Sequence, residues 1–360
     1  MKMELTPRSL TPQELPSLVN FLTEQLRSGV SWTIANEYPL VFQEANCPNI
    51  KALFHNNQIV AHAAIKYHII KNAVGLFKVA AIGSVVTAPE YRNQGHSQTL
   101  LNHCVESATQ DGADIAILWT DLFDFYRKLD FELAGFETNA ILDKPLNAPS
   151  LGLRFLESSK IDPSAILNLY SQHTVGSIRT PEELRKFLAI PNSRVFTAWD
   201  SENRLKAYAV EGKGADLKGY IHEWGGGVSE LLALFSHVQT QISSNVHVIM
   251  PRSSQNLRTR LTQAGAQINY GYLGMIRPLH TENLITKTKR YALSLGIQDF
   301  IFEKDSAGEF KIGRGTQIFK TKDLKTLTQV LFGTPDSTHY DSILSPILPI
   351  PMWIWGWDSV

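Results

Sequence analysis

The stretch SVVTAPEYRNQGHS, residues 84–97, is the most informative part of this sequence. An apolar run over 78–87 predicts a buried strand, and apolar residues at helical spacing after residue 97 predict a helix. A strand that turns through a polar loop into a helix points backbone N–H groups and a helix N-terminus outward, and both attract a pyrophosphate. Gly95 lets the backbone approach such a ligand, and Arg92 adds a positive charge. The pattern therefore predicts an anion-binding loop, although an ordinary strand-to-helix connection with an exposed arginine would look similar.

This loop resembles motif A of the GNAT superfamily of N-acetyltransferases, which has the form Val-x-Pro-x-x-Arg-x-x-Gly-x-Gly/Ala. Here Thr87 stands in place of the valine and Ser97 in place of the last small residue. It lacks the Gly-Lys-Ser/Thr ending of a P-loop. The resemblance implies that acetyl-coenzyme A is bound by backbone groups of Val85, Val86 and Thr87 and by a pyrophosphate loop made of Arg92, Asn93, Gln94, Gly95, His96, Ser97 and Gln98. For His96, a solvated surface position is the alternative.

A second landmark of the superfamily is an aromatic-Tyr-x-x-x-Gly-Phe element, which residues 125–131, FYRKLDF, resemble with Asp130 in place of the glycine. The resemblance implies that Tyr126 is the general acid for the leaving thiolate. A tyrosine, with a reference pKa of about 10, stays protonated at neutral pH. Packing is the alternative role for Tyr126. Asp121 and Asp124 either bind a cationic amine or lie in a solvated loop.

The order of strands and helices before residue 149 recurs after it, so the chain reads as two copies of one plan. The first copy begins with an amphipathic helix at 15–26 and a hairpin of strands at 51–55 and 59–70. In the second copy WGGGVS, residues 224–229, occupies the place of motif A without its arginine. We therefore expect no coenzyme there.

This layout resembles the Eis-like (enhanced intracellular survival) acetyltransferases. They have an active GNAT domain, a second GNAT-like domain without the cofactor loop, and a sterol-carrier-like domain. The resemblance implies an α/β (α+β) fold with tandem GNAT-like domains around mixed central sheets. We expect a catalytic domain at 1–148, a degenerate domain at 149–280 and a small α+β region at 281–360. That last region looks shorter than the usual sterol-carrier module.

The chain ends in a proline-punctuated apolar tail, PILPIPMWIWGWDSV, residues 346–360. Three prolines prevent a regular helix, and so apolar a segment should dock in a groove of its own protein. A strap over a core is one interpretation. The Eis-like resemblance implies another, in which the Val360 carboxylate lies near Tyr126 as the general base. Trp353, Trp355 and Trp357 could then form aromatic walls for a cationic amine.

Lysine plus arginine and aspartate plus glutamate both total 34, so no net field recruits nucleic acid, an anionic membrane or an acidic substrate. Cys47 and Cys104 provide neither a disulfide framework nor a thiolate zinc site, and we expect no metal. The N-terminus lacks the apolar core of a signal peptide, and no apolar run approaches the roughly 20 residues that span a bilayer. We expect a cytoplasmic protein.

The function implied by the resemblance is an acetyl-coenzyme A-dependent transfer of an acetyl group to a primary amine of a small molecule or peptide. A non-catalytic scaffold with the same architecture is the main alternative. Aminoacyl transfer on the same fold is another, but it would call for a basic stripe that binds RNA. Arg92, Gly95 and Tyr126 together favour the acetyltransferase. The acceptor stays open, because its pocket is assembled from distant segments.

Overall fold

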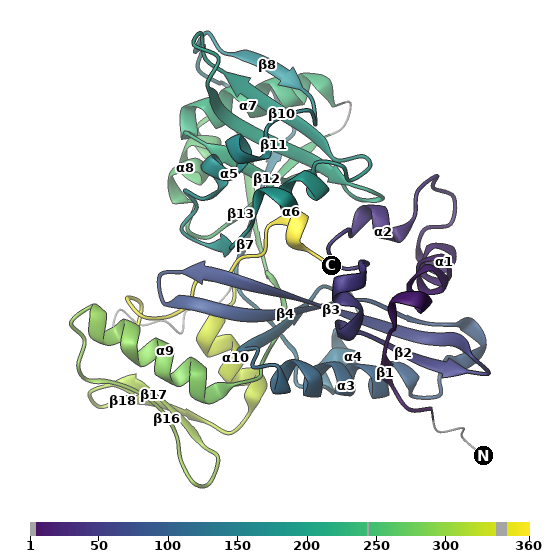
Figure 1. Ribbon diagram of the computed structural model, residues 1–360. Coiled ribbons are helices and arrows are strands. Elements are labelled where there is room, and N and C mark those ends of the chain that lie inside the picture. Colours follow the sequence, from purple (N-terminus) through teal and green to yellow (C-terminus); the bar gives the residue numbers. More distant parts are fainter. Residues whose placement is uncertain (1–4, 243–244, 336–343) are drawn as a thin grey trace.

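The computed structural model describes residues 5–242, 245–335 and 344–360 of the chain. Residues 1–4, on which part of the expectation about the N-terminus rests, lie outside this range. The fold is mixed α/β, with sheets of eight, seven and three strands among the described residues (Figure 1). None of the described helices combines the length and apolar character needed to cross a membrane.

The first sheet carries the predicted N-terminal elements. Its strand order is β1 (Arg8–Ser9), β2 (Ile50–His55), β3 (Gln58–Asn72), β4 (Gly75–Thr87), β5 (Ile115–Leu118), β15 (Gly274–Pro278) and β6 (Glu132–Ala134), with β9 (Gly176–Ser177) beside β3. Its helices are α1 (Leu15–Leu26), α2 (Ile34–Glu37), α3 (His96–Gln110) and α4 (Phe123–Arg127). The predicted hairpin is confirmed, and both turn residues, Asn56 and Asn57, adopt the left-handed backbone that asparagine tolerates.

The second sheet forms the upper lobe in Figure 1. Its order is β14 (Gln267–Gly271), β7 (Glu137–Leu142), β13 (Val246–Pro251), β12 (Asp216–Gly226), β11 (Leu205–Lys213), β10 (Arg194–Trp199) and β8 (Arg154–Glu157). The helices in this part of the chain are α5 (Pro163–Tyr170), α6 (Pro181–Phe187), α7 (Val228–Gln241) and α8 (Gln255–Gln263). The third sheet, β16 (Phe300–Lys304), β17 (Phe310–Arg314) and β18 (Gln317–Thr321), lies with α9 (Thr281–Ser294) and α10 (Leu324–Phe332).

The two large sheets exchange strands. β7 pairs with β13 and β14 in the second sheet, although it precedes residue 149. β15 pairs with β5 and β6 in the first sheet, although it lies at the end of the predicted second domain, 149–280. The apolar pattern of a strand specifies which face is buried but not which strand lies beside it. The predicted sequence ranges therefore do not coincide with the sheets.

The apolar tail lies between the two large sheets. Its side chains belong to the same continuous core as Ile70 and Phe77 of the first sheet and Trp224 of the second. Trp353, Trp355 and most other apolar side chains of 347–357 are almost fully buried. The C-terminus reaches the space between the upper lobe and the strands β3 and β4 (Figure 1). The prediction that the tail docks into its own protein is thus confirmed.

Candidate active site

The first sheet opens between β4 and β5. These parallel strands pair only from Val79 to Ala81 of β4, and β4 then continues to Thr87 with no described strand on that edge. A β-bulge lies in the part of β4 that does not pair with β5. There Ser84 and Val85 oppose the single residue Ala63 of β3. Bulges bend the strand that contains them and increase its twist. The bulge therefore turns the end of β4 away from β5 and leaves its backbone groups free for a ligand.

Ser84 itself has the left-handed φ of 52°, and its carbonyl oxygen lies 2.8 Å from Nδ1 of His62 on β3. The His62 ring is fully buried, and burial lowers its pKa to about 4. A neutral ring can donate from Nδ1 to the carbonyl without placing a charge beneath the bulge. This contact fixes the bulge from the opposite strand.

The predicted pyrophosphate loop follows β4. Arg92, Asn93, Gln94 and Gly95 are exposed before α3 begins at His96, and Gln98 is exposed in its first turn. Gly95 is the N-cap residue with φ 89°, a conformation that side chains rarely adopt, and there is open space where a Cβ would be. The N-terminus of α3 is therefore accessible to an anion.

Within this loop, His96 is buried and its Nε2 contacts no hydrogen-bonding partner in the described parts of the chain. The side chain of Arg92 donates from Nε to the carbonyl of Thr87 at 3.1 Å, which closes the loop onto the strand end. The two residues that depart from the family motif are bonded to each other, with 2.8 Å between Thr87 Oγ1 and Ser97 Oγ. The paired hydroxyls tie the strand end to the first turn of α3.

Tyr126 lies on α4, packed edge-to-face against Phe125 and Phe131. Its side chain is 7% exposed, and burial raises the pKa of its hydroxyl to about 12. The hydroxyl makes no hydrogen bond within the described residues. It is also absent from the fully buried unpaired polar atoms, so its oxygen is accessible. It is thus protonated at neutral pH and free to donate to a ligand.

The residues around Tyr126 explain one departure from the family pattern. Asp130 has φ 58°, which glycine adopts freely and aspartate tolerates better than most residues. Asp121 and Asp124 are both exposed, and Asp124 forms an ion pair with Arg127 at 3.2 Å. Both carboxylates therefore lie on the surface near the tyrosine helix.

Val360 lies against Gly83 of β4. Gly83 is two residues beyond Ala81, where the pairing of β4 with β5 ends. A Cβ placed on Gly83 would come within 2.6 Å of the Val360 carboxyl carbon and 2.8 Å of its oxygen. Only glycine permits this approach. The tail thus ends beside the bulge, at the opening of the sheet.

The acetyltransferase (GNAT) domain family matches residues 7–134. These residues form a GNAT domain. No curated protein matches the sequence. The fold is similar to that of a GCN5-related N-acetyltransferase from Anabaena variabilis, with 15% identity and a TM-score of 0.66 over 99% of this chain and 100% of that one. Eis1 from Mycobacterium abscessus has 12% identity and a TM-score of 0.59, covering 92% and 90%.

A third similar structure is a probable N-acyltransferase from Enterococcus faecalis, with 15% identity and a TM-score of 0.61 over 92% of this chain and 90% of that one. At these identities the likeness establishes the fold. The architecture of the chain, with two large mixed sheets and a small C-terminal α+β region, is therefore similar to that of Eis1.

The corresponding turn of the second sheet has no open loop. Only Gly227 separates the end of β12 from the start of α7, whereas eight residues, 88–95, separate β4 from α3 in the GNAT domain. A Cβ on Gly227 would collide with the carboxylate of Glu230, which folds back over the helix N-terminus. That negative charge occupies the position an anion would need.

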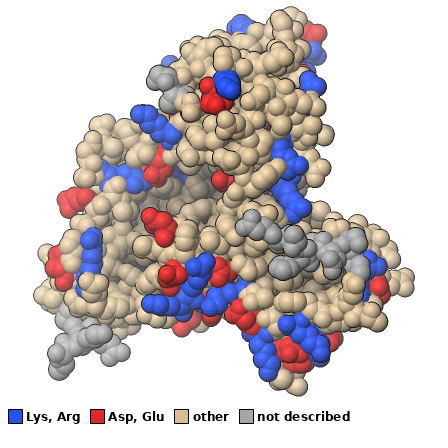
Figure 2. Space-filling model, turned by 180° about the vertical axis from the view of Figure 1, so that it is seen from behind, with Lys and Arg blue, Asp and Glu red and all other residues tan. Residues whose placement is uncertain are grey.

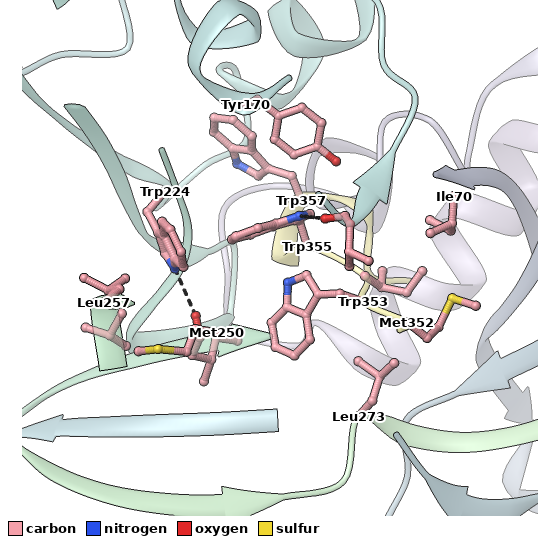
Figure 3. Close-up of a cluster of buried hydrophobic side chains, with 14 of the residues drawn as sticks. Ile70, Tyr170, Trp224, Met250, Leu257, Leu273, Met352, Trp353, Trp355 and Trp357 are labelled. Carbon is pink, nitrogen blue, oxygen red and sulfur yellow. Dashed lines mark hydrogen bonds between the residues drawn. The ribbon is translucent and has the colours of Figure 1, made fainter. Parts of the chain in front are cut away.

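Trp224 closes the gap between β12 and β13. It is 5% exposed and donates from Nε1 to the carbonyl of Ile249 at 3.1 Å (Figure 3). The Trp355 ring packs edge-to-face against it, with 5.1 Å between centroids. The space that is open in the GNAT domain is filled by indole rings here.

The tail tryptophans lie in this core. Trp355 donates to the carbonyl of Val175 at 3.1 Å, and Trp357 donates to Ser193 Oγ at 3.1 Å. Their exposures of 0% and 2% leave no indole face for a cationic amine in this conformation. The sequence thus correctly predicted that these residues dock with the tail. Their burial does not support the suggested aromatic wall for a cationic amine.

Charged groups elsewhere are dispersed. This holds for the surface shown in Figure 2, where lysine and arginine residues are interspersed with acidic ones; a buried set of charged groups around Arg179 is the exception. Within the described ranges, no three histidine, cysteine, aspartate or glutamate residues come together as metal ligands. Candidate chemistry is thus concentrated at the opening of the first sheet.

Proposed function

We propose that this chain is an acetyl-coenzyme A-dependent N-acetyltransferase that transfers the acetyl group to a primary amine of a small molecule or peptide. The observation that carries the proposal is the opening of β4 beyond Ala81, next to the accessible N-terminus of α3. A scaffold protein needs neither feature. The second sheet, in which both are filled, is what such a scaffold would look like.

The free edge of β4 supplies backbone groups of Val85, Val86 and Thr87 to acetyl-coenzyme A, and the N–H groups that face this edge serve as donors for the thioester carbonyl. Preorganised donors of this kind typically contribute about 100- to 1000-fold to the rate. The loop of Arg92 to Gln98 accepts the pyrophosphate, because its N–H groups and helix dipole favour negative charge. Range 1–148 without β7 but with β15 then forms the catalytic unit, the rest of 149–280 together with β7 is the degenerate unit, and 281–360 completes the core.

Tyr126 donates a hydrogen bond or a proton to the departing sulfur. Its pKa of about 12 keeps the proton in place until negative charge develops on the sulfur. In the 360-residue chain, the carboxylate of Val360 accepts the amine proton, through water, from its position at Gly83. Asp121 and Asp124 attract the cationic form of the amine before it is deprotonated.

The test is turnover of acetyl-coenzyme A with a panel of amines that includes an aminoglycoside, a polyamine, a lysine side chain and a peptide N-terminus. Release of free thiol and acetylated product in equal amounts is expected for at least one acceptor. Binding of acetyl-coenzyme A without turnover of any amine would favour a non-catalytic protein instead.

A further inference from the structure

The second domain holds the last residues of the tail through a buried ammonium group. Lys213, at the end of β11, is 1% exposed. Its Nζ donates to the carbonyl oxygens of Gly356 at 2.9 Å and Ser359 at 2.6 Å, and to Ser359 Oγ at 3.1 Å, with the Trp357 carbonyl at 3.3 Å. Burial lowers the pKa of Lys213 to about 7, while the carboxylate of Asp358 favours the charged form. An ammonium group has three donors and no acceptor. The short 3-10 turn Gly356–Asp358 therefore wraps around a donor group that satisfies its carbonyls.

A second cation binds the side chain of Asp358. Arg179 contacts Asp358 Oδ2 from Nη2 at 2.7 Å and from Nε at 3.1 Å. Its other edge pairs with both oxygens of Glu223 on β12 at 2.9 Å. All three side chains are at most 3% exposed. Removing one member of such a buried set leaves an unpaired charge, so the geometry is strongly held.

The third group that faces Asp358 is His68 of β3, with 3.9 Å between Nδ1 and Oδ1. Burial lowers the pKa of His68 to about 4, so its ring is neutral at pH 7. The opposing charge for Asp358 therefore comes from Arg179 of the second domain. The first domain contributes the surface of β3 and β4 against which the end of the tail packs.

Val360 follows Asp358 and Ser359, the residues that Arg179 and Lys213 bind. Its carboxyl group lies against Gly83, beside the opening of the GNAT sheet. We propose that Lys213 and Arg179 are positioning residues that hold the Val360 carboxylate against β4 during acetyl transfer. The inference rests on the proposed function. It assigns the degenerate domain a task in the reaction, although that domain has no open coenzyme loop of its own.

The first experiment compares Lys213→Met with Lys206→Met in the full chain. Lys206 lies on the same strand, and its side chain makes no hydrogen bond or ion pair within the described residues. Lys213→Met should lower kcat about 10- to 100-fold, a part of what general base catalysis typically contributes, and leave the Kd of acetyl-coenzyme A unchanged. The Lys206 variant should match the wild type in both.

A double-mutant cycle separates positioning from a general loss of structure. Three glycines are added after Val360, with and without Lys213→Met. If Lys213 acts through the carboxylate, its substitution in the extended chain should lower kcat less than about threefold further. An equal loss in both backgrounds would overturn the inference. So would an extension that leaves kcat unchanged, although acetyl transfer itself would then stand.

Gly83→Ala provides a variant that retains both Lys213 and Arg179. Its Cβ would displace the carboxylate, so kcat should fall about 10- to 100-fold while the docked tryptophans keep their fluorescence. Gly271→Ala, where the Cβ meets open space, is the control. Full activity of Gly83→Ala would show that the position of the carboxylate does not matter, and would overturn the inference even if Lys213→Met fails to fold.

Discussion

The two strand-to-helix turns of this protein, at 87–96 and 226–228, share a position in their sheets but differ in what occupies the gap beside them. In the GNAT domain the bulge at Ser84 bends β4 away from β5 and an eight-residue loop leaves α3 accessible. In the second domain Trp224 fills the gap and Glu230 covers the helix. The second turn thus differs from the first in having its space filled as well as in lacking an arginine.

The largest expected effect comes from Gly95→Asp. The aspartate would have to adopt φ 89° and would place a carboxylate in the proposed pyrophosphate loop. Calorimetry should give one acetyl-coenzyme A site per wild-type chain and none in the variant. Gly112→Asp, at the other end of α3 with φ 77°, carries the same backbone cost and should keep the site. A second site in the wild type would refute the contrast between the domains.

The next largest effect is expected for Tyr126→Phe. Loss of the hydroxyl should lower kcat about 100- to 10,000-fold and leave the coenzyme Kd nearly unchanged, because little contact area is removed. Steady-state kinetics with a slow and a fast acceptor provide the measurement. Tyr67→Phe, which removes a hydroxyl bonded to Asp111, is the control with wild-type kcat. Wild-type turnover of the Tyr126 variant with both acceptors would leave the tyrosine a packing role.

Opening the second gap should affect stability without creating a site. Trp224→Ala removes a buried indole, and large-to-small changes of this kind cost about 3–5 kcal/mol. Denaturant unfolding should show this loss, and calorimetry should still give one coenzyme site because Glu230 remains over α7. Trp119→Ala, at a residue 37% exposed, should cost less. If the Trp224 variant gained a second site, the indole alone would account for the difference between the domains.

Acid should destabilise the junction of the two domains with the tail. Burial lowers the pKa of His68 and His173 to about 4 and that of His222 to about 3, against 6.5 in the unfolded chain. Between these values the unfolded state binds more protons, so stability falls as pH decreases from about 6.5 to 4. Each histidine contributes up to about 1.4 kcal/mol per pH unit. Calorimetric Tm values should show a shallower slope for His68→Leu; an unchanged slope would contradict the assignment.

The smallest expected effect concerns the hydroxyl pair in the proposed cofactor loop. Thr87→Val and Ser97→Ala should each cost about 0.5–1.5 kcal/mol, because each leaves a half-buried hydroxyl without its partner. The double variant, which restores the usual residues of the motif, should cost less than the sum. Denaturant unfolding of all four proteins provides the coupling energy. Strict additivity would mean that the bond contributes nothing.

The sequence predicted those features that depend on local chemistry. The range 15–26 of the first helix, the asparagine hairpin and the loop at Gly95 follow from spacing and backbone preference within a few residues. The exchange of β7 and β15 did not follow, because the pairing partner of a strand lies far away in the sequence. Lys213 and Arg179 were also missed, since a lysine or arginine in a strand-rich segment usually lies in solvent. The positive φ of Asp130 could have been inferred from the glycine it replaces.

The exchanged strands bear on how the protein is made. Within the described residues β15 is the only strand between β5 and β6, so this part of the sheet stays incomplete until residues 274–278 have been synthesised. At roughly 5–20 residues per second, translation from β6 to β15 takes on the order of ten seconds. Throughout that interval the nascent chain carries unpaired strand edges of the kind that recruit other chains. The GNAT domain therefore completes its sheet only after β15 has emerged from the ribosome, by which time the strands of the second sheet have been synthesised as well.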